Sequence, residues 1–104
     1  MPEQKSSALR LDLNNPVFQK DWLSLPKEEV ERFRASLKQI SQMSWDQVYK
    51  SKGLHWEEII SKNGPDGKKL YSIRITGKFR AVVCRDQEFM RFLTLHPDHD
   101  SAYH

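Results

Sequence analysis

The chain of 104 residues contains a single cysteine, Cys84, and only four glycines. One cysteine excludes an intrachain disulfide and a Cys-x-x-Cys pair, so dithiol redox chemistry is not expected. Cys84 follows Val83 in an apolar run, which favours packing within a strand over a role as nucleophile. The sequence also has no Gly-rich phosphate loop and no Gly-x-Ser-x-Gly motif, which disfavours nucleotide hydrolysis and serine esterase chemistry.

Long apolar runs are missing as well. No stretch approaches the roughly 20 residues that a helix needs to cross a bilayer, and residues 1–10 lack the apolar core of a signal peptide. We therefore expect a cytoplasmic protein without a membrane partner. The 17 Lys and Arg residues outnumber the 14 Asp and Glu residues, and the net charge of +3 suits a polyanionic partner without requiring one.

The residues that are present favour one folded domain. Aromatic residues make up 11% of the chain, and their large rings can bury enough surface to support a core in a small protein. Residues 1–8 show no periodicity and are expected to form a flexible arm. A single domain is therefore predicted over residues 9–104.

The first part of this domain predicts a strand and a helix start. Leu9, Leu11 and Leu13 alternate with polar residues, which is typical of a short strand with one buried face. Asn15 before Pro16 predicts the start of a helix, because asparagine caps helices and proline is tolerated in the first turn.

Two further helical segments follow. A helix is predicted over residues 26–42, where apolar residues recur at three- and four-residue spacing: Val30, Phe33, Leu37 and Ile40. Ser44 with Gln47 resembles a capping box, which predicts a short helix that directs Trp45 and Val48 inward.

The second half shows the two-residue alternation of strands. Residues 54–60 form a possible strand, and the turn formers of 63–69 predict a loop. Three more strands are predicted at 71–76, 79–83 and 88–96. Their connections are too short for crossover helices, so these three strands must form an antiparallel meander. One face of the last strand is expected to carry the apolar residues Phe89, Leu93 and Leu95.

The predicted fold class is therefore α+β. An amino-terminal strand and a helical hairpin are expected to pack on a twisted, mainly antiparallel sheet.

Two arginines, Arg74 and Arg80, flank the turn of the first hairpin in the meander. A three-residue turn at 77–79 pairs Thr76 with Arg80 and sets both arginines on one face, whereas a two-residue turn at 77–78 separates them. On a shared face they would form a phosphate-binding patch with Lys78, because a guanidinium offers paired planar donors. The alternative is that they occupy the solvated side of a half-exposed sheet.

The carboxyl-terminal segment is rich in metal-ligand residue types, namely His96, Asp98, His99, Asp100 and His104. Their spacing matches neither a helical His-x3-His pair nor a zinc-finger frame, so no metal site is predicted. Acid–base chemistry by histidine is favoured instead. A solvated terminus is the plain alternative, although the amphipathic ring of Tyr103 would be expected to pack or to bond.

Two lysines, Lys50 and Lys52, precede two adjacent carboxylates, Glu57 and Glu58. A carboxylate near cations could act as a base. Surface charge pairs look the same in a sequence and are commoner.

The order of these elements resembles the RelE/ParE superfamily of bacterial toxin–antitoxin toxins. The resemblance covers about residues 9–103, and its most specific parts are the hairpin "LYSIRITGKFRAVV" and the carboxyl-terminal "FLTLHPDHDSAY". The hairpin is most similar to that of the YoeB and RelE type. This resemblance implies a ribosome-dependent mRNA endonuclease that needs no metal or other cofactor and whose basic sheet face binds mRNA.

The resemblance also implies roles for particular residues. Arg74 and Arg80 match the arginines that stabilise the phosphate, and Glu58 is taken as the base, with Glu57 as the alternative. The acid would be His96 or Tyr103, with His99 as the other candidate imidazole; His96 is preferred because a strand end is held more rigidly than a tail. The RNA-binding lysines would be Lys50, Lys52 and Lys78.

The implied partners are the ribosome with its mRNA and a separately encoded antitoxin protein, acidic in its toxin-binding part. Two other functions stay open within the superfamily. The chain could be a ParE-like toxin that inhibits DNA gyrase, or an inactive member that only binds an antitoxin.

Overall fold

The fold is seen in a computed structural model, which describes residues 7–97. Its elements follow the chain as β1 (Arg10–Asp12), α1 (Pro16–Leu23), α2 (Lys27–Ile40), α3 (Trp45–Lys50), β2 (Glu57–Asn63), the short 3-10 helix η1 (Pro65–Gly67), β3 (Lys69–Arg74), β4 (Arg80–Asp86) and β5 (Phe89–His96). The predicted α+β class is confirmed.

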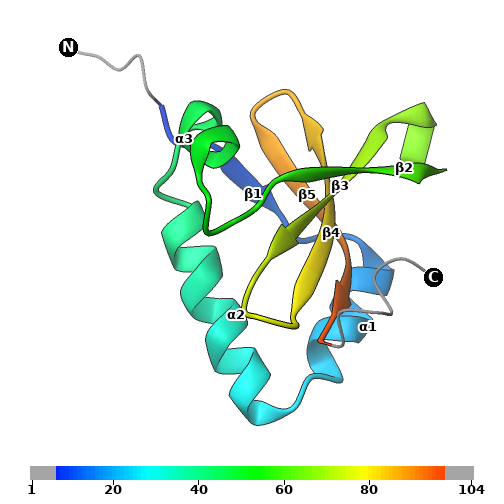
Figure 1. Ribbon diagram of the computed structural model, residues 1–104. Coiled ribbons are helices and arrows are strands. Elements are labelled where there is room, and N and C mark those ends of the chain that lie inside the picture. Colours follow the sequence, from blue (N-terminus) through cyan, green and yellow to red (C-terminus); the bar gives the residue numbers. More distant parts are fainter. Residues whose placement is uncertain (1–6, 98–104) are drawn as a thin grey trace.

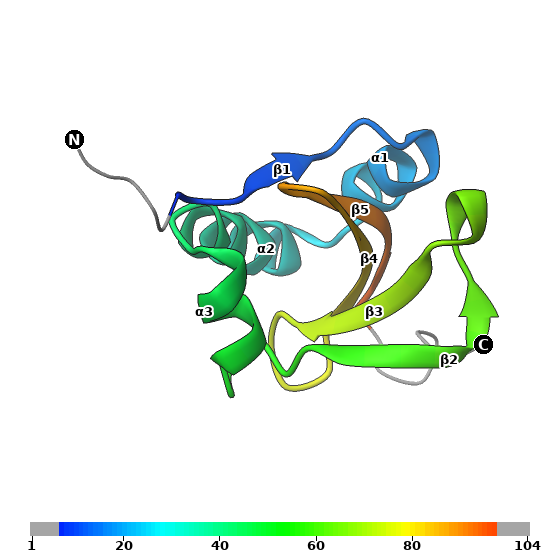
Figure 2. The same cartoon turned by 90° about the horizontal axis from the view of Figure 1, so that it is seen from above.

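One five-stranded sheet, ordered β1-β5-β4-β3-β2, forms the scaffold of the molecule. The pairs β3–β4 and β4–β5 are antiparallel, which confirms the predicted meander of the last three strands, and β2 adds a further antiparallel pair with β3. β1 adds a parallel edge beside β5, and α1, α2 and α3 lie in the connection between β1 and β2. Figures 1 and 2 show α2 and α3 along one side of the twisted sheet, while α1 lies near the end of β5.

Helix caps form where the sequence predicts them. The side chain of Asn15 accepts hydrogen bonds from the amides of Val17 and Phe18 at 2.8 and 3.1 Å, which begins α1. Ser44 and Gln47 form a reciprocal capping box at the start of α3. These bonds satisfy amides that have no partner within the helix, so they define the helix starts.

The main core, here called the helix-side core, lies between the sheet and the helices and is centred on Phe33 of α2. The Phe33 ring lies 5.8 Å from that of Phe18 on α1 and 5.7 Å from that of Phe92 on β5. It also contacts Phe79, at 6.0 Å, just before β4. Phe33 is fully buried and therefore joins two helices to the sheet.

A β-bulge in β5 overturns one prediction. Val82 pairs with Thr94 but Val83 pairs with Phe92, so Leu93 is the extra residue. The bulge shifts the alternation, and Phe92 and Leu95 belong to the helix-side core while Leu93 packs on the opposite face. The expectation that Phe89, Leu93 and Leu95 share one face is therefore wrong.

The sheet face that points away from α2 and α3, here called the open face, has its own small apolar cluster. It consists of Ile59, Leu70, Val82 and Cys84, with Leu93 packed against them. The prediction that Cys84 is packed within a strand is confirmed, and burial raises the pKa of its thiol. This cluster separates two groups of charged residues on the open face.

Candidate functional site

Three predicted site residues lie in one row across neighbouring strands. Arg74 of β3 is directly opposite Arg80 of β4, and Arg80 is directly opposite His96 of β5. Residues in direct cross-strand pairs have Cβ atoms roughly 4.5–5.5 Å apart on the same face. The structure therefore brings Arg74, Arg80 and His96 together on the open face, and these three residues are here called the arginine row. They lie at the end of the sheet where β3 turns into β4 (Figure 1).

The hairpin reaches this arrangement through a turn other than either predicted one. The amide of Ile75 donates to the carbonyl of Phe79 at 2.8 Å, so the turn is made by residues 76–78. Phe79 is fully buried in the helix-side core and is not part of the turn. Arg80 pairs with Arg74 and not with Thr76, so neither register considered from the sequence is observed. Of the two alternatives left open for the arginines, the shared face is the one that the structure has.

Arg80 is buried although it carries a permanent charge. Its exposed fraction is 8%, and its Nε and Nη1 atoms have no hydrogen-bond partner in the described part of the chain. The Nε atom of Arg74 is in the same condition. An unsatisfied buried donor costs on the order of 1–3 kcal/mol, and more when the group is charged. Such a pair of guanidiniums has the chemistry of a site for an anion.

His96 ends the row in a partly enclosed position. Its Nε2 lies 2.8 Å from the Thr94 hydroxyl, and the amide of the preceding Leu95 donates to the carboxylate of Asp21 at 2.9 Å. Burial lowers the pKa of His96, the Asp21 carboxylate opposes this effect, and Lys62 adds to it. The imidazole is therefore mainly neutral at pH 7 and suited to accept a proton.

An apolar hollow of about 380 Å³ adjoins the row. Its floor is the open-face cluster, and its rim includes polar side chains of α1, β2 and β5; the lining comprises Asn15, Val17, Ile59, Lys62, Asn63, Gly64, Pro65, Leu70, Val82, Leu93, Thr94 and His96. A ligand held by the arginines could place an apolar or aromatic group here.

The two candidate carboxylates lie on opposite faces of β2. Glu57 pairs with Ser72, which lies on the open face two residues before Arg74, whereas Glu58 pairs with Tyr71, which packs against the helix-side core. Alternation along a strand therefore puts Glu57 on the arginine face and Glu58 on the other. The structure does not bring Glu58, the preferred base, to the arginines.

His55 is a residue of this region that the sequence reasoning missed. Its Nε2 lies 3.3 Å from Oε1 of Glu57, and the amide of Arg74 donates to the carbonyl of the preceding Leu54 at 2.7 Å. The backbone of His55 is left-handed, with φ of 52°, so the chain turns sharply beside Arg74. The sequence shows only that a histidine stands two residues before a carboxylate. This spacing does not indicate a site unless the pairing of β2 with β3 is known.

The predicted RNA-binding lysines do not gather in one place. Lys78 is exposed in the turn between the arginine strands and belongs to the same end of the sheet. Lys50 lies on α3, on the helix side, where it pairs with Asp46 at 3.8 Å. Lys52 follows α3 and is exposed. Of the three, Lys78 alone is positioned to extend the arginine row.

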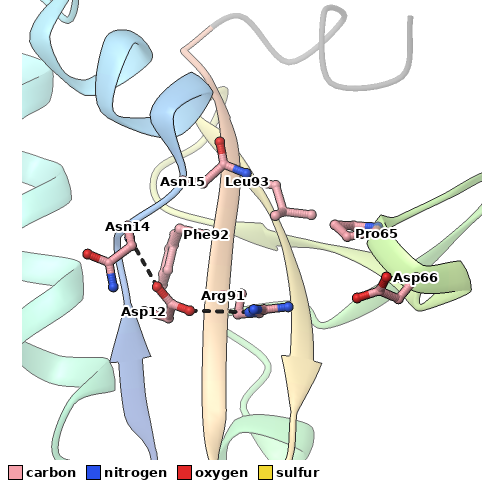
Figure 3. Close-up of a pocket in the computed structure, with 8 residues that line it drawn as sticks. All are labelled: Asp12, Asn14, Asn15, Pro65, Asp66, Arg91, Phe92 and Leu93. Atoms are coloured by element: carbon pink, nitrogen blue, oxygen red, sulfur yellow. Dashed lines mark hydrogen bonds and ion pairs between the residues drawn. The ribbon is translucent and has the colours of Figure 1, made fainter.

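The other charged group on the open face is neutralised. Arg91 Nε donates to the Asp12 carboxylate at 3.2 Å, and its Nη1 is 3.7 Å from Asp86. Figure 3 shows Arg91 and Asp12 joined in this way among the residues that line a pocket. The hydrogen bond to Asp12 raises the pKa of Arg91, with further support from Asp86. Arg91 is thus a structural arginine, in contrast to Arg74 and Arg80.

The predicted carboxyl-terminal residues fall outside this description. Asp98, His99, Asp100, Tyr103 and His104 lie beyond the described residues 7–97. Within that range no three His, Cys, Asp or Glu side chains are grouped as they would be around a metal ion. No helix in the same range has the length and apolar character to span a membrane.

Comparisons of the chain with protein-family models, with curated proteins and with solved structures found no match.

Proposed function

We propose that the chain is the toxin of a toxin–antitoxin system, a cytoplasmic, ribosome-dependent mRNA endonuclease that cleaves without a metal. The observation that carries this proposal is the row of Arg74, Arg80 and His96, with guanidinium nitrogens that are buried and unpartnered in the described residues. A phosphodiester supplies the anionic oxygens that such donors lack.

The two arginines would bind the scissile phosphate and stabilise the charge that develops on it. Donors fixed in a partly buried site act strongly on a transition state because they need little reorganisation. Arg80 is the better placed of the two, since its side chain is nearly fully buried between Arg74 and His96.

Cleavage would proceed by attack of the 2′-oxygen on the adjacent phosphorus, with formation of a 2′,3′-cyclic phosphate and rupture of the P–O5′ bond. Neutral His96 would accept the proton of the 2′-hydroxyl. The leaving 5′-oxygen needs a proton from the opposite side, because attacking and leaving oxygens are in line. His55, whose Nε2 lies 3.3 Å from Oε1 of Glu57 beyond Arg74, would donate that proton.

An antitoxin would inhibit this activity by covering the open face. Because the arginine row carries two positive charges, the segment that covers it should be acidic. The apolar hollow next to the row would bind one apolar side chain of that segment. These two features explain how one partner segment could hold the site closed.

The test is to add the purified chain to ribosomes programmed with a defined mRNA and to map the new 3′ ends. We expect discrete cuts that require ribosomes and that persist with protein stripped by a chelator before the assay. Intact mRNA together with arrested replication in cells would instead support gyrase inhibition. Absence of any toxicity would leave an antitoxin-binding module.

A further inference from the structure

A third pocket lies on the helix side of the sheet, where residues of α3, β3 and β4 line it. It encloses about 330 Å³ and combines aromatic with cationic side chains; its lining comprises Tyr49, Trp56, Lys68, Lys69, Tyr71, Arg85 and Gln87. None of these residues belongs to the arginine row.

The aromatic rings of this pocket are fixed by one another. Trp56 and Tyr71 are stacked with their centroids 4.3 Å apart and their planes 22° apart. Tyr49 meets Trp56 edge-on at 5.5 Å and keeps an exposed fraction of 46%. Flat rings that line an open pocket in fixed orientations can stack with a planar ligand at little conformational cost.

The cations beside these rings are only partly used. The Arg85 guanidinium lies 4.5 Å above the Trp45 ring, and its Nη1 donates to the Tyr49 hydroxyl at 2.6 Å and its Nε to the Gln87 carbonyl at 2.8 Å. Its charge has no carboxylate partner among residues 7–97, and no hydrogen bond is formed by its Nη2 within that range. Lys69 is exposed and forms no ion pair within the same range, whereas Lys68 lies 3.7 Å from Asp86. Two of the three cations can therefore bind an added anion.

We propose that this pocket binds an unpaired nucleotide of a single-stranded nucleic acid. The base would stack on the Tyr49 ring, which is 46% exposed and meets the Trp56–Tyr71 stack edge-on, and its phosphate would bind Lys69 and Arg85. Aromatic platforms beside cations are suited to single strands because every base has a π-face. Glu58 lies on the same face next to Tyr71 and is the carboxylate that opposes binding.

This site is separate from the arginine row, and the inference does not depend on cleavage. The pocket and the row lie on opposite faces of the sheet, and Lys69 and Arg74 are five residues apart, about 17 Å along a strand. A strand bound at one site would reach the other only by passing around the sheet edge, so the two sites would hold different nucleotides.

The experiment measures binding of fluorescein-labelled eight-nucleotide RNA and DNA strands, and of the corresponding duplex, to the full chain. Anisotropy gives the affinity, and tryptophan quenching reports stacking at Trp56. The variants are Tyr49→Ala, Tyr49→Phe and Lys69→Glu, with Lys38→Glu on the exposed surface of α2 as the charge-matched control. Arg80→Ala tests whether the measured binding occurs at the arginine row instead of this pocket.

We expect single strands to bind more tightly than the duplex. Tyr49→Ala should weaken binding by roughly 5- to 150-fold, the range measured for loss of one base-stacking ring. Tyr49→Phe, which keeps the ring, should stay within a few fold of wild type. Lys69→Glu should weaken binding, while Lys38→Glu and Arg80→Ala should retain the quenching. The RNA and DNA arms show which sugar is preferred.

The inference is overturned if no single strand binds, if Tyr49→Ala binds as well as wild type, or if Lys38→Glu weakens binding as much as Lys69→Glu. If Tyr49→Ala does not fold, Lys69→Glu still tests the site. This variant should fold, because Lys69 is exposed and outside the core. Loss of quenching in Arg80→Ala alone would assign the binding to the row instead.

Discussion

Arg74 and Arg80 face each other directly across β3 and β4, two like charges in one cross-strand pair. Such a pair is destabilising, and here it is combined with buried guanidinium nitrogens that have no hydrogen-bond partner among residues 7–97. A free protein that keeps this arrangement loses stability at the site. A bound anion would offset that loss, which makes the pair the central feature of the proposed phosphate site.

Replacing Arg80 with methionine should therefore stabilise the free protein by about 1 kcal/mol, because the variant removes unsatisfied buried donors. Inorganic phosphate should stabilise the wild type, by about 2.7 kcal/mol at one hundred times its dissociation constant, and should leave Arg80→Met unchanged. Urea unfolding with and without phosphate, at constant ionic strength, measures both effects.

The matched control is Arg91→Met on the same face. It removes the ion pairs with Asp12 and Asp86, so it should lower stability while leaving the phosphate response intact. An equal response to phosphate in wild type and Arg80→Met would contradict an anion site at Arg80.

The pH dependence of stability follows from His96. Its pKa is below the ordinary value of 6.5 in the folded protein because of burial, so the unfolded chain binds the proton more readily. The stabilising contribution is present above pH 6.5 and is lost as the pH falls from 6.5 through the folded-state pKa. The free energy of unfolding of the wild type should fall more than that of His96→Gln over this interval. Parallel curves for the two proteins would remove His96 as the source.

Glu57 and Glu58 should differ in cleavage assays because they lie on opposite faces. Glu57→Gln removes the carboxylate that lies 3.3 Å from Nε2 of His55, so we expect cleavage to fall by roughly tenfold. Glu58→Gln should cleave like wild type and should bind single strands more tightly at the aromatic pocket. Loss of cleavage in Glu58→Gln alone would restore it as the base.

Much of the fold could be predicted because local signals were strong. The Asn15 cap, the Ser44 capping box and the apolar stripe of α2 each depend on residues within one or two helical turns. The parallel pairing of β1 with β5 could not be predicted, because it joins segments about 80 residues apart. The bulge at Leu93 was also missed, since it depends on how β5 aligns with β4.

The site was predicted in part for the same reason. The sequence left two turns open, and only the three-residue one put Arg74 and Arg80 on one face. The observed turn also has three residues, 76–78, so the two arginines share a face although the turn begins one residue earlier than the one considered. The choice between Glu57 and Glu58 needed the pairing of β2 with β3, which no local pattern determines. His55 joins the site through a left-handed backbone and a contact with Glu57, and both are features of the folded chain.

The core around Phe33 gives a prediction about stability alone. Phe33→Ala removes a fully buried ring of α2 that contacts Phe18 of α1 and Phe92 of β5. The free energy of unfolding should therefore drop by about 3–5 kcal/mol. Lys38→Ala on the exposed surface of the same helix should change it by less than about 0.5 kcal/mol. Denaturant titration of both variants measures the difference, and a small effect of Phe33→Ala would contradict the central position of this ring.

The most direct measurement compares mRNA cleavage by wild type, Arg80→Ala and Arg91→Ala on programmed ribosomes, with the new 3′ ends quantified at each site. Arg80 should contribute to transition-state stabilisation, so we expect Arg80→Ala to lower cleavage by about 100-fold or more. Arg91→Ala should retain cleavage within a few fold, because Arg91 is paired with Asp12 and Asp86 and lies away from the row. Cleavage by Arg80→Ala at the wild-type rate, or no cleavage by the wild type, would contradict the account.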